Sequence, residues 1–524
     1  MKPPRLLHEH LVDRGTSDMR ERIALVVDGQ SYRFCELLDA ARRLAAALQE
    51  RGVSRGDRVA IYLDNTWSCV VSIYGTLLAG AVLVLVNPQT KAHKLAFLLR
   101  DCGARGLLAD ERLHPIFNEA LRALDSPPFV ICAGATSGGS VTSFDSALGA
   151  QPASGTTSTI PLDLAAIIYT SGSTGDPKGV MQTHQSMMFA CSSIIEYLRL
   201  SQDDRILSFL PLAFDYGLYQ LLMSVALGAC LILERSFTFP GEIFERIRDE
   251  RITVFPGVPT IFATLLAAQN RSSLRFPTVT RVTNTAAALP DEFVHGLREI
   301  FPNALIYKMY GLTECKRVSY LDPALIDAKP GSVGKAIPGT EVQLLSPDGK
   351  CVPPGEVGIL HVRGPHVMVG YWNRPDLSEE MLKPGKFPGE RTLCTHDLFR
   401  MDAEGFLYFI RRTDEIIKTR GEKVSPVEVE NALHHIPGVR EVAVVGIPDS
   451  LLGEAICAYV VADPAAALTP QAIRAASAAF LEPYAVPSRV ILCEQLQRSP
   501  NGKIDKPALR KALVEHEGLS ACRT

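Results

Sequence analysis

The sequence predicts an α/β fold: a large N-terminal domain of two parallel-type α/β sheet subdomains plus a small β-barrel-like subdomain, followed by a small α+β C-terminal domain. The 524 residues exceed one ordinary domain. Short apolar strands alternate with helical patterns up to about residue 340, and short strands between Gly and Pro turns follow. We place the domain boundary between residues 1–413 and residues 414–524.

The first elements follow from hydrophobic periodicity. Apolar residues recur at helical spacing over residues 34–48, and Gly52 ends this helix. Residues 57–63 then form a strand. Residues 65–90 carry no charge and are long enough to span a bilayer. Because a βα pattern precedes them, we interpret them as a buried helix and a buried parallel strand at residues 82–86.

Strand–helix alternation continues along the chain. We expect strands at residues 163–169, 230–233 and 253–255, and a surface connection over the Gly-, Ser-, Thr- and Ala-rich residues 134–160. Beyond residue 340 the short segments EVQLL, GILHV and FLYFI indicate a small antiparallel subdomain. The last stretch, residues 414–524, is typical of a β, α, β, β, α order.

Composition restricts the class of protein. Apolar residues make up 47% and charged residues 21%, and the formal net charge is −3. Because the chain has no net positive charge to attract polyanions, we expect no nucleic-acid partner and no membrane partner. The twelve cysteines have no paired CxxC spacing, which favours reduced thiols in a cytoplasmic protein over disulfides or a zinc site. A monomer or a homodimer is expected.

The most informative segment is YTSGSTGDPKG, from Tyr169 to Gly179. It follows an apolar strand and precedes a predicted helix from about His184. Small residues let backbone N–H groups approach an anion, the hydroxyls add donors, and Lys178 adds charge. The alternative is a flexible Ser/Gly loop, which rarely ends in Pro-Lys-Gly after a buried strand. The spacing differs from the Walker A pattern, so we predict an ATP phosphate-binding loop of another kind.

This segment resembles the signature loop of the superfamily of AMP-forming acyl-CoA synthetases, peptide-synthetase adenylation domains and luciferases. Three more segments are similar to motifs of that superfamily, in the same order: MYGLTE (309–314), THDLFRMDAEGFLYFIRRTDEIIKTRGEKVSPVEVE (395–430) and SPNGKIDK (499–506). The resemblance therefore covers almost the whole chain.

The resemblance implies an enzyme that uses ATP and Mg²⁺ to activate a carboxylic acid as an acyl-adenylate and then passes the acyl group to a thiol. Negative charge builds during adenylation, so cations and oriented donors are needed. Glu314 is the expected magnesium ligand, Thr313 would donate to a phosphate, and Tyr310 would face adenine. Lys178 is the expected cation of the phosphate loop. The loop residues expected to bind ATP are Thr170, Ser171, Gly172, Ser173, Thr174 and Gly175.

Asp397 and Arg412 correspond to the superfamily residues that reach the ribose hydroxyls. The chain departs from the usual pattern beside both: Thr-Gly-Asp is Thr395-His396-Asp397 here, and Gly-Arg is Arg411-Arg412. The carboxylate and the guanidinium are both present, so the departures put in doubt the local backbone conformation and not the activity. We expect His396 and His184 to be structural, because no metal-ligand spacing supports them.

The C-terminal domain is implied to be mobile. Lys503 matches the superfamily lysine that contacts the reacting carboxylate and phosphate during adenylation, where a positive charge stabilises the transition state. Asp414 corresponds to the hinge between two poses. The other pose brings in the loop of Gly421 and opens a thiol tunnel. The alternatives are a solvated lysine and a helix-capping aspartate in a linker.

By the same resemblance, the acyl pocket lies beside residues 214–219 and 309–320. A buried carboxylate at Asp215 requires a cationic partner. That partner is either a substrate amine, which would make the acid a small polar amino acid, or Lys316 or Arg317 of this chain, which would make Asp215 structural. The polar character of the region argues against a long aliphatic tail. The remaining expected pocket residues are Phe214, Tyr219, Met309, Arg317 and Val318.

The thiol acceptor is either CoA or the phosphopantetheine of a separate carrier protein, since no carrier attachment motif follows Lys503. A medium- or long-chain fatty acyl-CoA synthetase remains an alternative. So does a catalytically inactive nucleotide-binding relative, although the intact Lys178, Glu314, Asp397, Arg412 and Lys503 favour an active ligase. Nothing in the sequence indicates a luciferase-like oxygenase.

Overall fold

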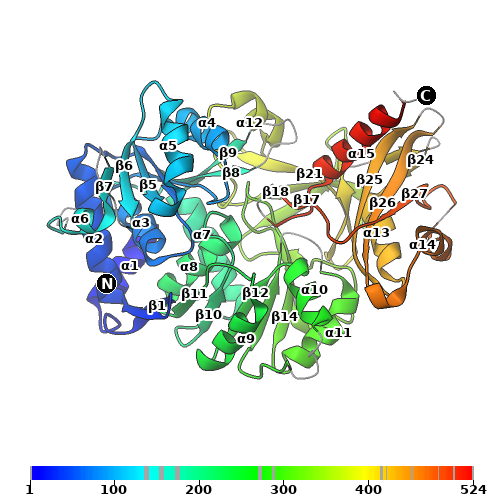
Figure 1. Cartoon of the computed structure of the whole chain (residues 1–524), viewed down its shortest axis with the longest axis horizontal. Helices are drawn as coiled ribbons and strands as arrows, with labels where there is room; N and C mark the ends of the chain where they lie inside the picture. Colours follow the sequence, from blue (N-terminus) through cyan, green and yellow to red (C-terminus); the bar gives the residue numbers. More distant parts are fainter. Residues whose placement is uncertain are drawn as a thin grey trace. The chain divides into compact units, whose positions relative to one another are not determined.

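The computed structural model describes residues 3–134, 141–152, 158–170, 177–268, 274–285, 289–413, 417–419, 422–449, 452–481, 483–499 and 502–521 (Figure 1). The chain divides into two compact units. Unit 1 comprises Met1–Ala328, Ala336–Val342 and Val362–Leu393, and unit 2 comprises Lys329–Lys335, Gln343–His361 and Cys394–Thr524. Unit 2 thus includes segments that precede residue 414, and the functional boundary at 413/414 stays a prediction.

The first sheet of unit 1 has nine strands in the order β16-β15-β14-β13-β12-β10-β11-β1-β2. Its central strands are parallel, and β2 and β15 join their neighbours antiparallel. The helices α9, α10 and α11 lie along this sheet (Figure 1). The strands are β1 (Ile23–Val27), β2 (Gln30–Arg33), β10 (Arg205–Ser208), β11 (Cys230–Leu233), β12 (Val254–Gly257), β13 (Arg281–Asn284), β14 (Leu305–Tyr310), β15 (Ser319–Leu321) and β16 (Lys335–Ala336).

The second sheet has eight strands in the order β19-β9-β8-β4-β3-β5-β6-β7. It is parallel from β8 to β7, whereas β9 pairs antiparallel with both β8 and β19. The strands are β3 (Arg58–Tyr62), β4 (Val82–Leu85), β5 (Gly106–Asp110), β6 (Phe129–Ala133), β7 (Val141–Ser143), β8 (Leu164–Thr170), β9 (Lys178–Thr183) and β19 (Gly370–Tyr371).

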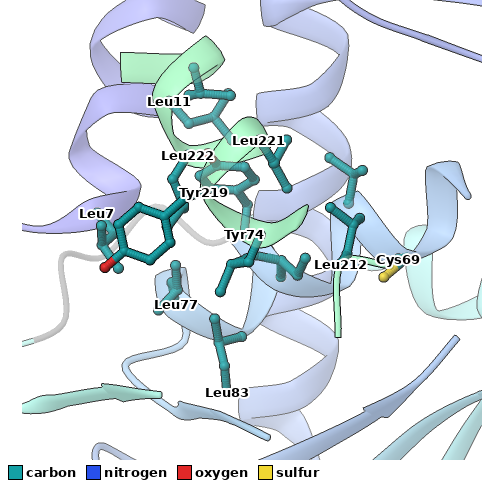
Figure 2. Close-up of a cluster of buried hydrophobic side chains, with 14 of the residues drawn as sticks. Leu7, Leu11, Cys69, Tyr74, Leu77, Leu83, Leu212, Tyr219, Leu221 and Leu222 are labelled. Carbon is teal, nitrogen blue, oxygen red and sulfur yellow. The ribbon is translucent and has the colours of Figure 1, made fainter. Parts of the chain in front are cut away.

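One hydrophobic core joins the two sheets. It includes Ile206 and Leu231 of the first sheet, Ile61 and Leu83 of the second, and side chains of the helices α1, α2, α3, α7 and α8. Figure 2 shows part of this core, where Tyr74, Leu77 and Tyr219 lie among leucines of α1 and α8. The helices of unit 1 are α1 (Leu7–Thr16), α2 (Phe34–Glu50), α3 (Trp67–Leu78), α4 (Ala92–Cys102), α5 (His114–Arg122), α6 (Phe144–Leu148), α7 (His184–Leu198), α8 (Asp215–Leu227), α9 (Pro240–Asp249), α10 (Pro259–Ala267), α11 (Asp291–Ile300) and α12 (Pro375–Met381).

The remaining strands form two five-stranded sheets. One has the order β17-β18-β21-β20 with β22 on β21, and the other has the order β24-β23-β26-β25 with β27 on β26. The second of these, with its helices, is the α+β fold expected for the C-terminus. The elements are β17 (Glu341–Leu345), β18 (Val357–Arg363), β20 (Leu382–Pro384), β21 (Arg391–Met401), β22 (Leu407–Arg412), β23 (Ile417–Thr419), β24 (Glu422–Val424), α13 (Pro426–His434), β25 (Val439–Asp449), β26 (Gly453–Ala462), α14 (Pro470–Ser477), β27 (Arg489–Leu492) and α15 (Lys506–Ala521).

The predicted fold class is confirmed. The uncharged residues 65–90 form the buried α3 and β4, and no helix in the described part of the chain has the length and apolarity needed to cross a membrane. The expectation of a surface connection at residues 134–160 is wrong in part. β7 extends the second sheet there, and α6 buries Phe144 and Ala147, because a few apolar residues outweigh the Ser/Gly-rich composition around them.

Candidate active site

The predicted phosphate loop connects two antiparallel strands. Thr170 ends β8, Lys178 begins β9, and the two residues are paired in the register of the hairpin. The predicted helix then begins at His184 as α7. Thr170 lies at the carboxyl end of β8, the edge of a parallel sheet where ligands generally bind. Ser171, Gly172, Ser173, Thr174 and Gly175 lie outside the described residues.

Lys178 and Glu314 are brought together by a residue that the sequence analysis did not identify. The Tyr371 hydroxyl donates a 2.6 Å hydrogen bond to Glu314 Oε1. The Lys178 Nζ lies 5.6 Å from the centroid of the Tyr371 ring, within the range of a cation–π interaction. The predicted metal ligand and the predicted phosphate cation therefore share one aromatic neighbour.

The Glu314 carboxylate has the properties of a magnesium ligand. It is half-buried, and within the described residues its hydrogen-bonding partner is the Tyr371 hydroxyl, on one of its two oxygens. The described residues contain no group of three or more acidic, His or Cys side chains that could hold a metal alone. A single carboxylate suits Mg²⁺, which usually takes one or two carboxylates and completes its shell with phosphate oxygens and water. Glu314 therefore fits the predicted role.

Thr313 and Tyr310 precede Glu314 in the same segment of the chain. Tyr310 ends β14 at its carboxyl end and is half-buried. Thr313 is also half-buried, and its carbonyl oxygen accepts a 3.1 Å hydrogen bond from Gln182 Nε2. The segment that follows β14 thus places three of the predicted site residues at one edge of the first sheet.

The segment from Gly311 to Arg317 folds back on itself. A Cβ atom at Gly311 would lie 2.3 Å from the Lys316 carbonyl oxygen, so only glycine fits there. At the other end, the Arg317 N–H donates to the Cys315 carbonyl at 2.6 Å, and Lys316 has a φ of 62°. A three-residue turn with a positive φ at a lysine is strained. This turn directs the Lys316 side chain toward α8.

Lys316 forms an ion pair with Asp215, the first residue of α8. Its Nζ lies 3.3 Å from Asp215 Oδ2 and 4.2 Å from the centroid of the Tyr219 ring. The Lys316 side chain is only 4% exposed. Burial lowers the pKa of Lys316 to about 7, although the Asp215 carboxylate opposes that shift. The hypothesis of an amino-acid substrate depended on an Asp215 whose cationic partner is the substrate amine, but Lys316 of this chain already pairs with Asp215.

Arg317 adds a second buried cation. It is 2% exposed, its Nη1 donates to the Thr285 hydroxyl, and its guanidinium lies 5.6 Å from the centroid of the Tyr216 ring. Its Nε has no hydrogen-bond partner among the described residues. Lys316, Arg317 and Asp215 therefore place three ionisable side chains close together in this region.

The other predicted pocket residues have more ordinary surroundings. Phe214 is half-buried and precedes α8, and Val318 is fully buried. Met309 is buried, and its sulfur accepts a 3.0 Å hydrogen bond from the Tyr197 hydroxyl. Tyr219 belongs to the core (Figure 2), and its ring also contacts the Lys316 ammonium. Packing accounts for Val318 and Met309 without a substrate.

In unit 2, Asp397 and Arg412 are paired across the β21–β22 hairpin. Arg412 Nη1 lies 3.1 Å from Asp397 Oδ1. His396 adopts a φ of 58°, the left-handed conformation that the usual glycine takes easily. A side chain in this conformation costs roughly 1–2 kcal/mol. At the other substituted position, burial lowers the pKa of Arg411.

Lys503 lies at the exposed end of a tight turn in unit 2. The Ser499 N–H donates to the Lys503 carbonyl at 2.7 Å, and a β-bridge joins Arg498 to Ile504. Arg498 Nη2 donates a 2.6 Å hydrogen bond to Glu441 Oε2, which links this segment to β25. The Lys503 residue itself is exposed to solvent. Asp414 and Gly421, the predicted hinge and thiol-tunnel residues, lie outside the described residues.

Comparison with known proteins identifies the family. The AMP-binding enzyme family matches residues 12–372, and the AMP-binding enzyme C-terminal domain matches residues 428–503. The long-chain-fatty-acid–CoA ligase of Bacillus subtilis (strain 168) is 31% identical over 98% of this chain and 95% of its own length.

Solved structures give the same result. An anthranilate CoA ligase in complex with anthranoyl-AMP superimposes with a TM-score of 0.90 and 26% identity, covering 99% of this chain and 100% of that one. The o-succinylbenzoate coenzyme A synthetase of Bacillus subtilis, in complex with ATP and magnesium, gives a TM-score of 0.81 and 28% identity, covering 95% and 98%. The chain therefore belongs to the AMP-binding enzyme family. Within it, this protein is an AMP-forming acid–thiol ligase.

Proposed function

We propose that this enzyme joins a compact, polar carboxylic acid to coenzyme A by way of an acyl-adenylate. In the first step a carboxylate oxygen attacks the α-phosphorus of ATP, and the bond from that phosphorus to pyrophosphate breaks. In the second step the CoA sulfur attacks the acyl carbon, the thiol proton is lost, and AMP leaves with the carboxylate oxygen that it acquired. ATP and CoA are thus both consumed as substrates.

Several of the predicted site residues have proposed roles in the first step. Glu314 would hold Mg²⁺, which supplies positive charge that stabilises the phosphate oxygens. Lys178 and the loop from Thr170 would bind the phosphates, and Tyr310 would face adenine. Asp397 would accept hydrogen bonds from the ribose hydroxyls, with Arg412 orienting its carboxylate. Lys503 is proposed to reach the reacting oxygens when the C-terminal domain takes its adenylation pose.

The choice of acid rests on the 3.3 Å contact between Lys316 and Asp215, beside the buried Arg317. An aliphatic chain packed against Lys316 and Arg317 would displace water from their N–H groups and offer no acceptor in its place. Burying unpaired polar groups in this way is costly. A hydroxyl or a second carboxylate on the acid would instead accept from Lys316 or Arg317. We therefore propose an acid with such an acceptor, in place of the amine expected by the amino-acid hypothesis.

A long-chain fatty acid is the second candidate. The observation that favours it is the similarity of the whole chain to the fatty-acid–CoA ligase of Bacillus subtilis. The buried charges near Asp215 oppose it for the reason given above. CoA is favoured as the acceptor because the relatives reported above are CoA ligases.

Matched pairs of acids test the proposal. Pyrophosphate release is measured for a hydroxy acid or a dicarboxylic acid against its unsubstituted analogue, for an amino acid against its des-amino analogue, and for decanoate. We expect the parent enzyme to favour the acid with the acceptor by about tenfold or more, because a buried donor left unpaired costs about 1–3 kcal/mol. Replacing both Lys316 and Arg317 with methionine should abolish this preference, whereas the exposed Lys91→Met should retain it.

Two outcomes would contradict this choice of acid. A parent enzyme that works best on decanoate would support the fatty-acid candidate, with the ligase assignment unchanged. A parent enzyme that prefers the amino acid to its des-amino analogue, with that preference lost in Asp215→Ala, would restore the substrate ammonium as the partner of Asp215.

A further inference from the structure

We propose that Tyr371 is a positioning residue that holds the Glu314 carboxylate in the orientation required to bind Mg²⁺. The inference rests on the proposed function in one respect, the metal-binding role of Glu314. It concerns a residue that lies outside the four sequence motifs and is separated from Glu314 by 57 positions.

The backbone around Tyr371 fastens two parts of the site together. The Met368 N–H donates to the Glu314 carbonyl oxygen at 2.7 Å, and the Trp372 N–H donates to the Gly179 carbonyl oxygen at the same distance. Between them, Tyr371 pairs with Val180 in the β19–β9 register. A segment of five residues thus joins the turn that carries Glu314 to the strand that begins with Lys178.

The Tyr371 side chain is held as firmly as its backbone. The residue is 4% exposed, and its N–H donates to the Ser378 Oγ at 2.8 Å. The hydroxyl donates to Glu314 Oε1 at 2.6 Å, the short distance typical of a bond to a carboxylate. An ordered tyrosine therefore fixes one carboxylate oxygen of Glu314 and leaves the other for a metal ion.

The same ring separates two opposite charges. Lys178 Nζ lies over the ring face, while the ring's hydroxyl is bonded to Glu314, and no ion pair between Lys178 and Glu314 occurs within the described residues. A direct pair would neutralise the carboxylate needed by the metal and the ammonium needed by the phosphates. Tyr371 binds each of them in a way that preserves both charges.

Such outer partners of metal ligands have measurable effects. A hydrogen bond to a ligating carboxylate fixes its orientation before the metal arrives, and its loss typically weakens metal affinity by about 10–100-fold. Tyr371→Phe removes only the hydroxyl and keeps the ring under Lys178. The expected defect is therefore specific to Mg²⁺ and absent when ATP binds without metal.

Calorimetric binding of α,β-methylene ATP to the full-length protein, with and without Mg²⁺, measures this defect directly. In Tyr371→Phe we expect Mg²⁺ to tighten nucleotide binding about tenfold less than in the parent, with metal-free binding unchanged. Glu314→Gln should lose all of the tightening, and the double variant should match Glu314→Gln alone. Tyr62→Phe is the matched control, since its buried hydroxyl donates to the Thr90 carbonyl at 2.7 Å.

Three results would overturn the proposal. In the first, Tyr371→Phe weakens nucleotide binding equally with and without Mg²⁺, as a packing defect would. In the second, the two substitutions have additive effects, which would make Tyr371 independent of Glu314. In the third, Tyr371→Phe keeps the full magnesium effect. Acid-dependent pyrophosphate release by the parent enzyme, measured on the same preparation, shows separately whether the proposed function itself holds.

Discussion

Replacing Lys503 with alanine is expected to reduce adenylate formation by roughly 10²–10³-fold, the typical cost of losing one charge-stabilising donor in a transition state. Thioester formation from a chemically synthesised acyl-adenylate should remain close to that of the parent. The two steps should separate because Lys503 is proposed to reach the reacting oxygens only when the C-terminal domain is in its adenylation pose. Pyrophosphate release and thioester yield, measured on the same protein, give the two rates.

Lys511→Ala is the control for this substitution, since Lys511 is an exposed lysine of α15 in the same unit. It should leave both steps unchanged. If Lys503→Ala slowed both steps equally, Lys503 would act in both poses or support folding, and the assignment of two poses would be wrong.

Replacing Glu314 with glutamine is expected to produce the second large effect. Charge stabilisation by a metal ion is worth several kcal/mol, so adenylation should slow by a factor on the order of 100 at fixed Mg²⁺. The Mg²⁺ concentration required for half-maximal activity should rise, because a neutral amide is a poorer ligand for a hard cation than a carboxylate. A magnesium titration of pyrophosphate release measures both effects.

The control is Glu299→Gln, which changes an exposed carboxylate of α11 that lies 3.3 Å from His295 Nε2. It should titrate with Mg²⁺ like the parent. A Glu314→Gln variant with the parent's magnesium dependence would remove Glu314 from the metal site and assign any loss of rate to the geometry of the turn.

Much of this site could be predicted because its chemistry lies in short contiguous segments. The strand β8, the Ser/Gly loop and Lys178 occur within fifteen residues of sequence, and Glu314 is the fourth residue after the end of β14. Local patterns of this kind determine which residues begin and end an element, so the placement of the Ser/Gly loop after the strand expected at residues 163–169 followed from the strand–helix alternation, whereas Glu314 was identified from its motif.

Other features depend on long-range pairing and were not predicted. Tyr371 reaches Glu314 because β19 pairs with β9, and nothing within the sequence near Gly370 indicates that pairing. The strand β9 itself was missed, since its residues follow a glycine-rich loop and precede a helix. Long-range strand pairing is set by tertiary packing, to which a local sequence window is insensitive.

The partner of Asp215 also could not be identified from the sequence. Both Lys316 and Arg317 were available as candidates, and the choice between them depends on the direction in which each side chain leaves the turn. The positive φ of Lys316 reverses the chain over three residues. A lysine in the sequence does not predict a positive φ, which is more usual at glycine or asparagine. The structure pairs Asp215 with Lys316, one of the two internal partners that the sequence offered.

The central claim is that a carboxylate oxygen attacks the α-phosphorus of ATP, and oxygen isotope transfer tests it most directly. The accepted acid is prepared with ¹⁸O in both carboxylate positions and incubated with ATP, Mg²⁺ and CoA. The account predicts that the AMP released carries one ¹⁸O atom and that the thioester retains the other. Unlabelled AMP, or ADP together with ¹⁸O-labelled phosphate, would contradict it, because the carboxylate would then have attacked a different atom or none.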